Sequence, residues 1–185
     1  MPILPTEVQF YLSNPNAGGG YQGIGTPGNS RGKFMSTSQV SAANPIDNLF
    51  QDVTGPQNAA GQVDYQCVFV MNNTISGDYM HNPYVWMPLQ LFTSGGCFMT
   101  VGMDPAGPVP YNSPTAQAAL INTNTSAPAG VSAWYSPNMV FTAGLLVPDI
   151  APQYCIAIWI QRTAVDSPPV MPQSLTLQIT FSTNA

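Results

Sequence analysis

The chain has 185 residues but only three basic and eight acidic side chains, for a net charge of −5. Charged residues make up 6% of the sequence, whereas about 25% is typical of soluble domains. Tight nucleic-acid binding needs several Lys or Arg side chains to displace phosphate counterions, so these numbers argue against a DNA or RNA partner. No run of about 18 apolar residues is present, so no membrane-spanning helix and no membrane partner are predicted.

Hydrophobic residues make up 44% of the chain, which indicates a folded protein with a sizeable core. A free soluble monomer generally relies on surface charge to avoid self-association. The composition therefore favours a subunit whose surface is covered by neighbours in an assembly. The alternative is a secreted or viral β protein that tolerates a neutral polar surface. The N-terminal stretch MPILPTEVQ lacks the basic and apolar regions of a signal peptide.

The first third of the chain predicts two strands separated by a long flexible segment. Residues 8–12 (VQFYL) follow a Pro-rich start and predict a short strand. Residues 13–33 are rich in Gly, Asn and Pro without apolar periodicity, which predicts a long loop or an arm that orders against a neighbour. Residues 34–40 predict a weak strand, 44–53 a helical turn, and 54–62 a polar turn.

The middle of the chain predicts further short strands. Residues 63–71 (VDYQCVFVM) alternate between two faces, whereas Pro88 demotes residues 84–92 to an edge or bulged strand. Residues 97–103 predict another strand, followed by a Pro- and Gly-rich stretch at 104–114. Residues 115–121 fit a helical turn or a short loop, and 131–135 and 140–146 complete this region as strands.

Residues 154–162 (YCIAIWIQR) give the clearest strand signal in the sequence. Tyr154, Ile156, Ile158 and Ile160 share one face, and the opposite face is also mostly apolar. A strand covered on both sides belongs in the middle of a two-layer β protein or in a sheet that a partner chain covers. Residues 174–182 alternate apolar and polar side chains, which predicts a last strand with one polar face.

Eight to ten short strands separated by turns predict an all-β fold. We expect an antiparallel β-sandwich and prefer a jelly-roll-like arrangement to an immunoglobulin-like one. The predicted organisation is an N-terminal strand with a Gly- and Pro-rich arm or loop over residues 1–35, and a β-sandwich domain over residues 36–185.

The sequence offers no catalytic constellation. The GIGTPG run at residues 23–28 matches a dinucleotide-binding pattern, but no helix is predicted after it. His81 is the only histidine, and no G-x-S-x-G elbow accompanies it. Cys67, Cys97 and Cys155 are predicted to be buried free thiols, with a Cys67–Cys155 disulfide left open. No enzymatic activity, cofactor or metal site is predicted.

Apolar side chains are therefore the candidates for function, as contacts between subunits. Aromatic residues at interfaces act as anchors, although most aromatic residues in any fold pack in its core. Trp159 is the favoured anchor because it lies opposite the isoleucine face of its strand. The predicted assembly contacts are Tyr21, Ile24, Arg31, Trp134 and Trp159.

Three stretches resemble a group of tailed-bacteriophage virion proteins. They are NLFQDVTGPQNAAGQVDYQCVFVMNN (residues 48–73), SAPAGVSAWY (126–135) and YCIAIWIQRTAV (154–165). In that group a D-x-x-G … A-G … Y-R-C-x-Y-V-K-N run and an A-I-W-I-R-R run recur. Gln66, Met71 and Gln161 stand where basic residues would be expected, which argues against a basic docking surface.

The resemblance implies a structural virion protein without catalytic residues. The leading hypothesis is a capsid cement or decoration protein on the outer surface of the head, bound to the major capsid protein and to itself as a homotrimer. A tail, neck or head-fibre component with host-surface contact is the alternative. A β-sandwich hydrolase or lectin-like accessory is a third hypothesis, from another class of protein.

Overall fold

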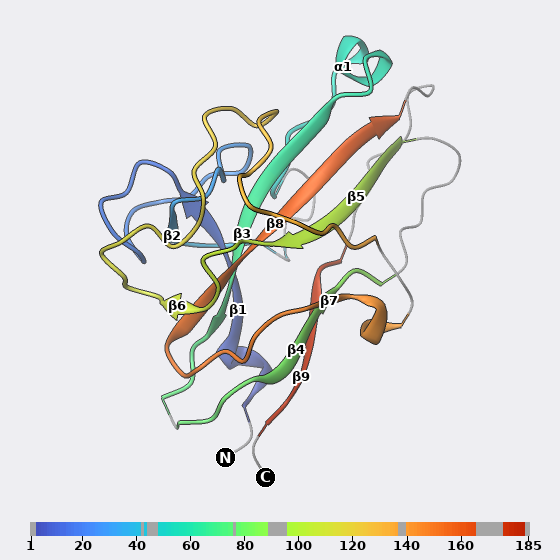
Figure 1. The fold of residues 1–185 in the computed structure, drawn as a ribbon. Helices are drawn as coiled ribbons and strands as arrows, with labels where there is room; N and C mark the ends of the chain where they lie inside the picture. The colour runs from blue at the N-terminus through green and yellow to red at the C-terminus, as the bar shows by residue number, and fades with distance from the viewer. Residues whose placement is uncertain are drawn as a thin grey trace.

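The chain forms two antiparallel sheets in the computed structural model, which describes residues 3–41, 43, 48–75, 77–88, 96–136, 140–165 and 176–183 (Figure 1). The larger sheet contains six strands: β1 (Val8–Asn14), β2 (Phe34–Gln39), β3 (Val63–Asn72), β5 (Gly96–Met103), β6 (Val109–Pro110) and β8 (Tyr154–Val165). The smaller contains three: β4 (His81–Trp86), β7 (Leu145–Leu146) and β9 (Gln178–Ser182). The prediction of a β-rich antiparallel fold is thus confirmed.

β8 lies inside the larger sheet, where β3 pairs along one edge and β5 and β6 pair along the other. The strand orders are β2-β1-β3-β8-β5, with β6 beside β8, and β7-β4-β9. These orders do not establish jelly-roll connectivity. Both sheets contribute side chains to one apolar cluster, which lies between them. We call this the first cluster; its fully buried members include Ile156, Ile158, Val70, Val85 and Ile150.

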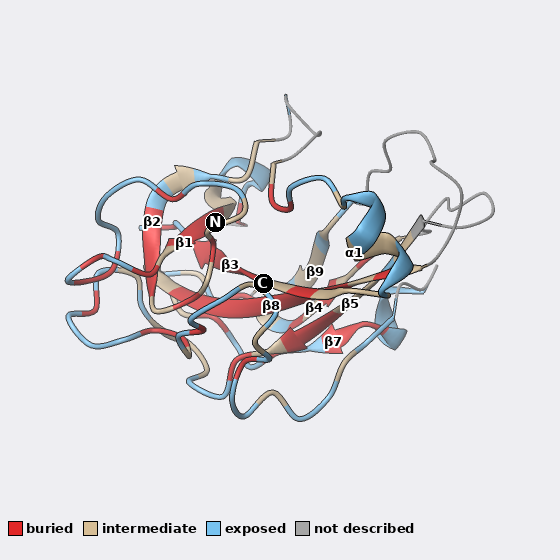
Figure 2. Cartoon of the chain, turned by 90° about the horizontal axis from the view of Figure 1, so that it is seen from above, coloured by how far each residue is buried: buried red, intermediate tan, exposed pale blue. Residues whose placement is uncertain are grey.

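The opposite face of β8 is covered by loops of the same chain. Its second cluster is built around Trp159, Phe69 and Met35 and is closed by Ala118 and Ile121 from the loop after β6. The alternation predicted for β8 and β3 is confirmed, since their odd and even positions enter different clusters. Figure 2 shows the resulting band of buried residues along β8 and β3. No partner chain is needed to cover the middle of this strand.

The glycine-rich segment after β1 folds back as a packed loop and is not an extended arm. Ser30 is fully buried; its carbonyl oxygen accepts a 2.6 Å hydrogen bond from the Cys67 amide, and its hydroxyl donates to the Cys67 carbonyl. The Gly20 amide donates to the Ser113 carbonyl at 2.9 Å. β1 itself pairs with β2 and β3, so the strands on both sides of this loop belong to the larger sheet.

Several element boundaries differ from the predictions. Residues 48–53 contain no helix, and residues 44–47 lie outside the described part. The short helix α1 (Gly55–Ala59) forms instead in the predicted polar turn, because Thr54 and Gln57 make a capping box and Pro56 suits the first turn.

The region after β6 also contains less strand than predicted. Residues 115–121 form a loop, and the backbone of residues 131–135 pairs with the sheet at one position, between Tyr135 and Val101. Residues 140–146 divide between the 3-10 helix η2 (Phe141–Ala143) and β7. Residues 89–92 and 174–175 of two predicted strands lie outside the described residues. A second 3-10 helix, η1 (Pro5–Glu7), precedes β1. None of the helices in the described part is long and apolar enough to cross a membrane.

Candidate functional site

The five predicted contact residues lie in different environments. Ile24 is 76% exposed and Tyr21 is 40% exposed, both on the packed loop after β1. Tyr21 is held edge-on against Tyr11 and Tyr111, with ring centroids 5.8 and 5.2 Å away. The loop therefore presents Ile24 to solvent from a fixed position, which is what a contact between subunits requires.

Trp159 is not available to a neighbouring subunit. It has no exposed area, and its Nε1 donates a 2.9 Å hydrogen bond to the Asp104 carboxylate. The expectation that Trp159 anchors an intersubunit contact is therefore wrong for this structure. Its strand face is apolar because loops of the same chain cover it.

Arg31 and Trp134 are only partly exposed. The Arg31 guanidinium donates to the Asn29 side chain at 2.8 Å and to the Asn122 carbonyl, so it ties two loops together. The Trp134 ring lies 5.7 Å from the Tyr65 ring and packs against the second cluster. Both side chains thus have structural roles within the subunit, which leaves limited area for a neighbour.

Two further surfaces carry exposed apolar side chains, and Trp134 is the only one of the five predicted contact residues that belongs to either. The first, which we call the outer patch, consists of Tyr84, Trp86, Phe141 and Leu146 on the outward face of the smaller sheet. The Phe141 ring lies edge-on to the Tyr84 ring, with centroids 5.7 Å apart, and is tilted against the Trp86 ring, with centroids 6.5 Å apart. Leu146 pairs with Tyr84 in the β4–β7 register. Phe141 and Leu146 remain 39% and 50% exposed.

The second surface, which we call the β5 surface, consists of Phe98 with Tyr65, Trp134 and Tyr135. The β5–β8 register pairs Phe98 with Thr163, on the sheet face that carries the second cluster. Phe98 is 61% exposed and Tyr135 is 37% exposed. The sequence predicted strands here, but nothing in its spacing showed which strand face the loops would leave open.

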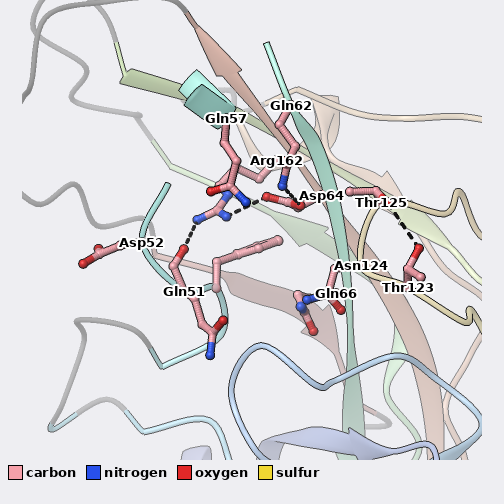
Figure 3. Close-up of a pocket in the computed structure, with 11 residues that line it drawn as sticks. Gln51, Asp52, Gln57, Gln62, Asp64, Gln66, Thr123, Asn124, Thr125 and Arg162 are labelled. Carbon is pink, nitrogen blue, oxygen red and sulfur yellow. Dashed lines mark hydrogen bonds and ion pairs between the residues drawn. The ribbon is translucent and has the colours of Figure 1, made fainter. Parts of the chain in front are cut away.

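A polar pocket of about 150 Å³ lies beside β3 and β8 of the larger sheet, near α1 (Figure 3). Its lining comes from five separate segments and consists mostly of neutral amide and hydroxyl side chains: Gln51, Gln57, Gln62, Gln66, Thr123, Asn124 and Thr125. The remaining lining residues are Phe50, Asp52, Asp64 and Arg162. Nothing in the sequence indicated this pocket, because its lining residues come from distant segments; the hydrogen bond from Arg162 to the Gln51 carbonyl joins residues 111 positions apart.

A buried ion pair fixes one wall of the pocket. Arg162 and Asp64 stand opposite each other in the β3–β8 register and are 9% and 5% exposed. An Arg162 terminal nitrogen lies 2.7 Å from the Asp64 carboxylate, and the Gln62 side chain donates to the other carboxylate oxygen at 2.7 Å. The guanidinium also stacks 4.6 Å above the Phe50 ring. These contacts hold the Arg162 side chain in one orientation.

The His81 ring contacts a carboxylate at the surface. Its Nδ1 lies 2.6 Å from Asp149, and Asp149 also accepts a 2.9 Å hydrogen bond from the Asn82 amide. Two hydrogen bonds lower the pKa of the Asp149 carboxyl: the one from the Asn82 amide has the larger effect, and the one with His81 has the smaller. The hydroxyl of Ser182 donates to the His81 carbonyl, not to its ring, and Nε2 is enclosed without a hydrogen-bond partner among the described residues.

The GIGTPG run lies in the packed loop and leads into β2 rather than into a helix. Among the described residues, no three His, Cys, Asp or Glu side chains gather closely enough to hold a metal ion. The absence of a cofactor, a metal and an enzymatic activity stays a prediction.

None of the three cysteines forms a disulfide; Cys67 and Cys155 are fully buried as predicted, whereas Cys97 is partly exposed. Cys155 stands opposite Met71 in the β3–β8 register, four residues along from Cys67. That offset corresponds to about 13 Å, beyond the roughly 7 Å Cα separation that a disulfide tolerates. Burial raises the pKa of the Cys155 thiol to about 12 and also raises the pKa of Cys67.

Comparisons with protein-family models, with curated proteins and with solved structures found no match to this chain.

Proposed function

We propose that this chain is a structural protein of a tailed-bacteriophage virion, and that it acts as a capsid cement or decoration protein on the outer surface of the head. The resemblance of residues 48–73, 126–135 and 154–165 to virion proteins suggests this class. Within it, the observation that carries the proposal is the exposure of the outer patch and the β5 surface on a chain with eleven charged side chains. Exposed apolar patches in a protein with so little protective charge indicate surfaces that neighbours cover.

The proposed mechanism is stabilisation of one capsid state by binding. A subunit that binds only the assembled, expanded shell stabilises that shell by its own binding free energy, against the pressure of the packaged DNA. Contacts with the major capsid protein would be made by apolar and neutral polar groups, since only three basic side chains are present. A homotrimer at a local three-fold axis would bridge neighbouring capsomers.

We also propose that the two sheets form a jelly-roll-like sandwich. The first cluster, which both sheets share, supports a sandwich. A crystal structure with eight strands joined by two Greek-key connections would support the jelly roll, and any other connectivity would refute it.

Copy number in purified virions tests the location. Quantitative mass spectrometry against the major capsid protein should find hundreds of copies per particle for a cement protein. A dozen copies or fewer would favour the neck, tail or head-fibre alternative, and no copies would refute a virion role.

A binding experiment tests the mechanism. The purified protein should co-sediment with expanded capsids but not with unexpanded shells. Equal binding to both forms would contradict the proposed stabilisation, because a ligand with equal affinity for two states shifts neither.

A further inference from the structure

β9 lies at an edge of the smaller sheet, and the described part of the chain does not cover its outer side. The strand order β7-β4-β9 gives β9 one neighbouring strand, β4. No described backbone group outside β4 donates a hydrogen bond to the backbone of residues 178–182 or accepts one from it. At such an edge, alternate residues present an amide and a carbonyl that another strand can bind.

The other strand edges of the described chain are covered by loops or are short. Backbone groups of residues 21–23 form hydrogen bonds of 2.7 and 3.0 Å with Met35 and Thr37 of β2. Tyr135 exchanges two backbone hydrogen bonds with Val101 of β5. β6 and β7 contain only two residues each. β9, with five residues, is therefore the strand edge that is best placed to bind a further strand.

β9 also lacks the features by which proteins usually protect a strand edge. Those features are charged side chains, proline residues and bulges. The strand reads QITFS, and no charged residue occurs in residues 167–185. Its pairing with β4 is irregular between His81 and Tyr84, but the extra residue there belongs to β4, so β9 itself remains regular.

The first cluster is incompletely covered where it meets β9. Val85 of β4 and Leu145 of β7 belong to this cluster and are 0% and 5% exposed. Leu177, Ile179 and Phe181 pack against the same cluster but are only partly buried. A strand added beside β9 would cover more of these three side chains and would bury further apolar area.

The sequence of β9 is complementary to an antiparallel copy of itself. In the register that places Thr180 opposite Thr180 of the copy, Ile179 of each strand stands opposite Phe181 of the other. Gln178 of each strand then stands opposite Ser182. A β-branched side chain opposite an aromatic one is a favourable cross-strand pair, and so are two threonines. Because the strand has no charged residue, this register brings no like charges together.

We propose that β9 pairs with β9 of a second copy of this chain, antiparallel and across a two-fold axis at Thr180. The two smaller sheets then form one six-stranded sheet in the order β7-β4-β9-β9-β4-β7. Because the axis is perpendicular to this sheet, the outer patches of both copies lie on the same face. The contact is two-fold, so it is distinct from the three-fold contact of the proposed homotrimer, and it does not depend on the capsid role.

Sedimentation equilibrium of the purified full chain tests the proposal. Five residues span only about 17 Å, so the contact is short and a Kd of about 0.1–1 mM is expected. The weight-average mass should therefore rise as the protein concentration increases from about 10 µM to about 1 mM.

Charged variants at the axis assign the association to β9. Thr180→Lys places two like charges opposite each other and should weaken association at least about tenfold, as should Thr180→Glu. An equimolar mixture of these two variants should associate again, because opposite charges then face each other. This recovery also shows that both variants fold, although each loses the hydroxyl that accepts from Trp86 Nε1. Thr125→Lys adds the same charge at an exposed loop position and should leave association unchanged.

A cysteine cross-link tests the register. Residues directly opposite in an antiparallel pair have Cα atoms about 4.5–5.5 Å apart, which a disulfide can span. Thr180→Cys, made in a Cys97→Ser chain, should therefore give a disulfide-linked dimer under mild oxidation. Gln178→Cys in the same chain is the matched control. In this register its two copies are offset by four residues, or about 13 Å, so it should remain uncross-linked.

The proposal is overturned if the mass does not rise with concentration, or if Thr180→Lys associates as tightly as the unaltered chain. Failure of the mixed Thr180→Lys and Thr180→Glu variants to associate, with circular dichroism showing that both are folded, would also overturn it. A dimer that forms more readily with Gln178→Cys than with Thr180→Cys would refute the axis at Thr180. The capsid proposal survives each of these results, because its tests are copy number and binding to expanded shells.

Discussion

The Asp104 carboxylate closes the loop cover over the second cluster, and its removal should strongly destabilise the fold. Asp104 is 1% exposed; one carboxylate oxygen accepts hydrogen bonds from Trp159 Nε1 at 2.9 Å and from the Ala119 amide at 2.8 Å. The other accepts from the Ala106 amide at 3.0 Å. Asp104→Ala leaves the indole and Ala119 donors without their carboxylate partner, at about 1–3 kcal/mol each. The free energy of unfolding should therefore fall by about 4 kcal/mol, a large part of the 5–15 kcal/mol typical of a domain.

Urea denaturation followed by tryptophan fluorescence measures this loss. With a slope of about 2 kcal/mol per molar, the midpoint should fall by about 2 M. Trp159→Phe removes the indole donor and keeps an aromatic ring, so a double-mutant cycle isolates the Asp104–Trp159 hydrogen bond. A coupling of about 1.5–3 kcal/mol is expected for a hydrogen bond to a charged group. A loss below about 1 kcal/mol for Asp104→Ala, or coupling near zero, would refute the view that this contact secures Trp159 inside the subunit.

Three further predictions concern the loops, the thiols and the exposed surface. Gly32→Ala should lower the free energy of unfolding, measured by thermal denaturation, by more than about 2 kcal/mol, because φ is +83° and the added methyl would lie 1.9 Å from the Ala119 carbonyl oxygen. The control Gly107→Ala has φ +67° but open space around the added methyl, so it should lower the free energy of unfolding by only about 1 kcal/mol. The Cys155 thiol has a folded-state pKa of about 12, raised from 9.0, so its contribution to stability is intact below pH 9. That contribution should decline above pH 9 by up to about 1.4 kcal/mol per pH unit. The measurement is Tm from pH 7 to 10.5 for the unaltered chain and for Cys155→Ala, and an equal fall in both would contradict this. Ile24→Ser should leave Tm unchanged but weaken capsid binding by about tenfold, and unchanged binding would remove Ile24 from the interface.

The packed loop also changes what a deletion should do. As an arm, residues 13–33 could be removed without loss of the fold. In the structure, Ser13 and Ser30 are fully buried and Ser30 bonds the β3 backbone at Cys67. We therefore expect deletion of residues 13–33 to unfold the chain, as judged by circular dichroism, and a cooperative unfolding transition in the deleted chain would contradict this.

The strands with strict alternation were the most predictable part of the fold. In the middle of β8 and β3, alternate residues enter the two clusters as expected. Alternation shows that a face is apolar but does not show what covers it. That is why Trp159 was expected to contact a neighbour, whereas a loop more than 35 positions away supplies its cover through Ala118 and Ile121.

The candidate sites were less predictable, because they depend on contacts between distant segments. Arg162 and Asp64 meet only because β8 and β3 pair in one register. The outer patch requires η2 to place Phe141 beside Tyr84, where the sequence indicated a continuous strand. Gln66 was noticed only as a departure from a basic consensus, and the missing signal was the partner that its side-chain oxygen lacks. Such a deficit becomes visible only in three dimensions.

The covering of the outer patch and the β5 surface by neighbouring subunits is tested most directly by an electron cryo-microscopy map of the purified virion. The account predicts this fold on the outside of the head, with Phe141 or Phe98 buried against a neighbouring subunit. A map that lacks the protein, or that shows it on the head with both side chains facing solvent, would contradict the account.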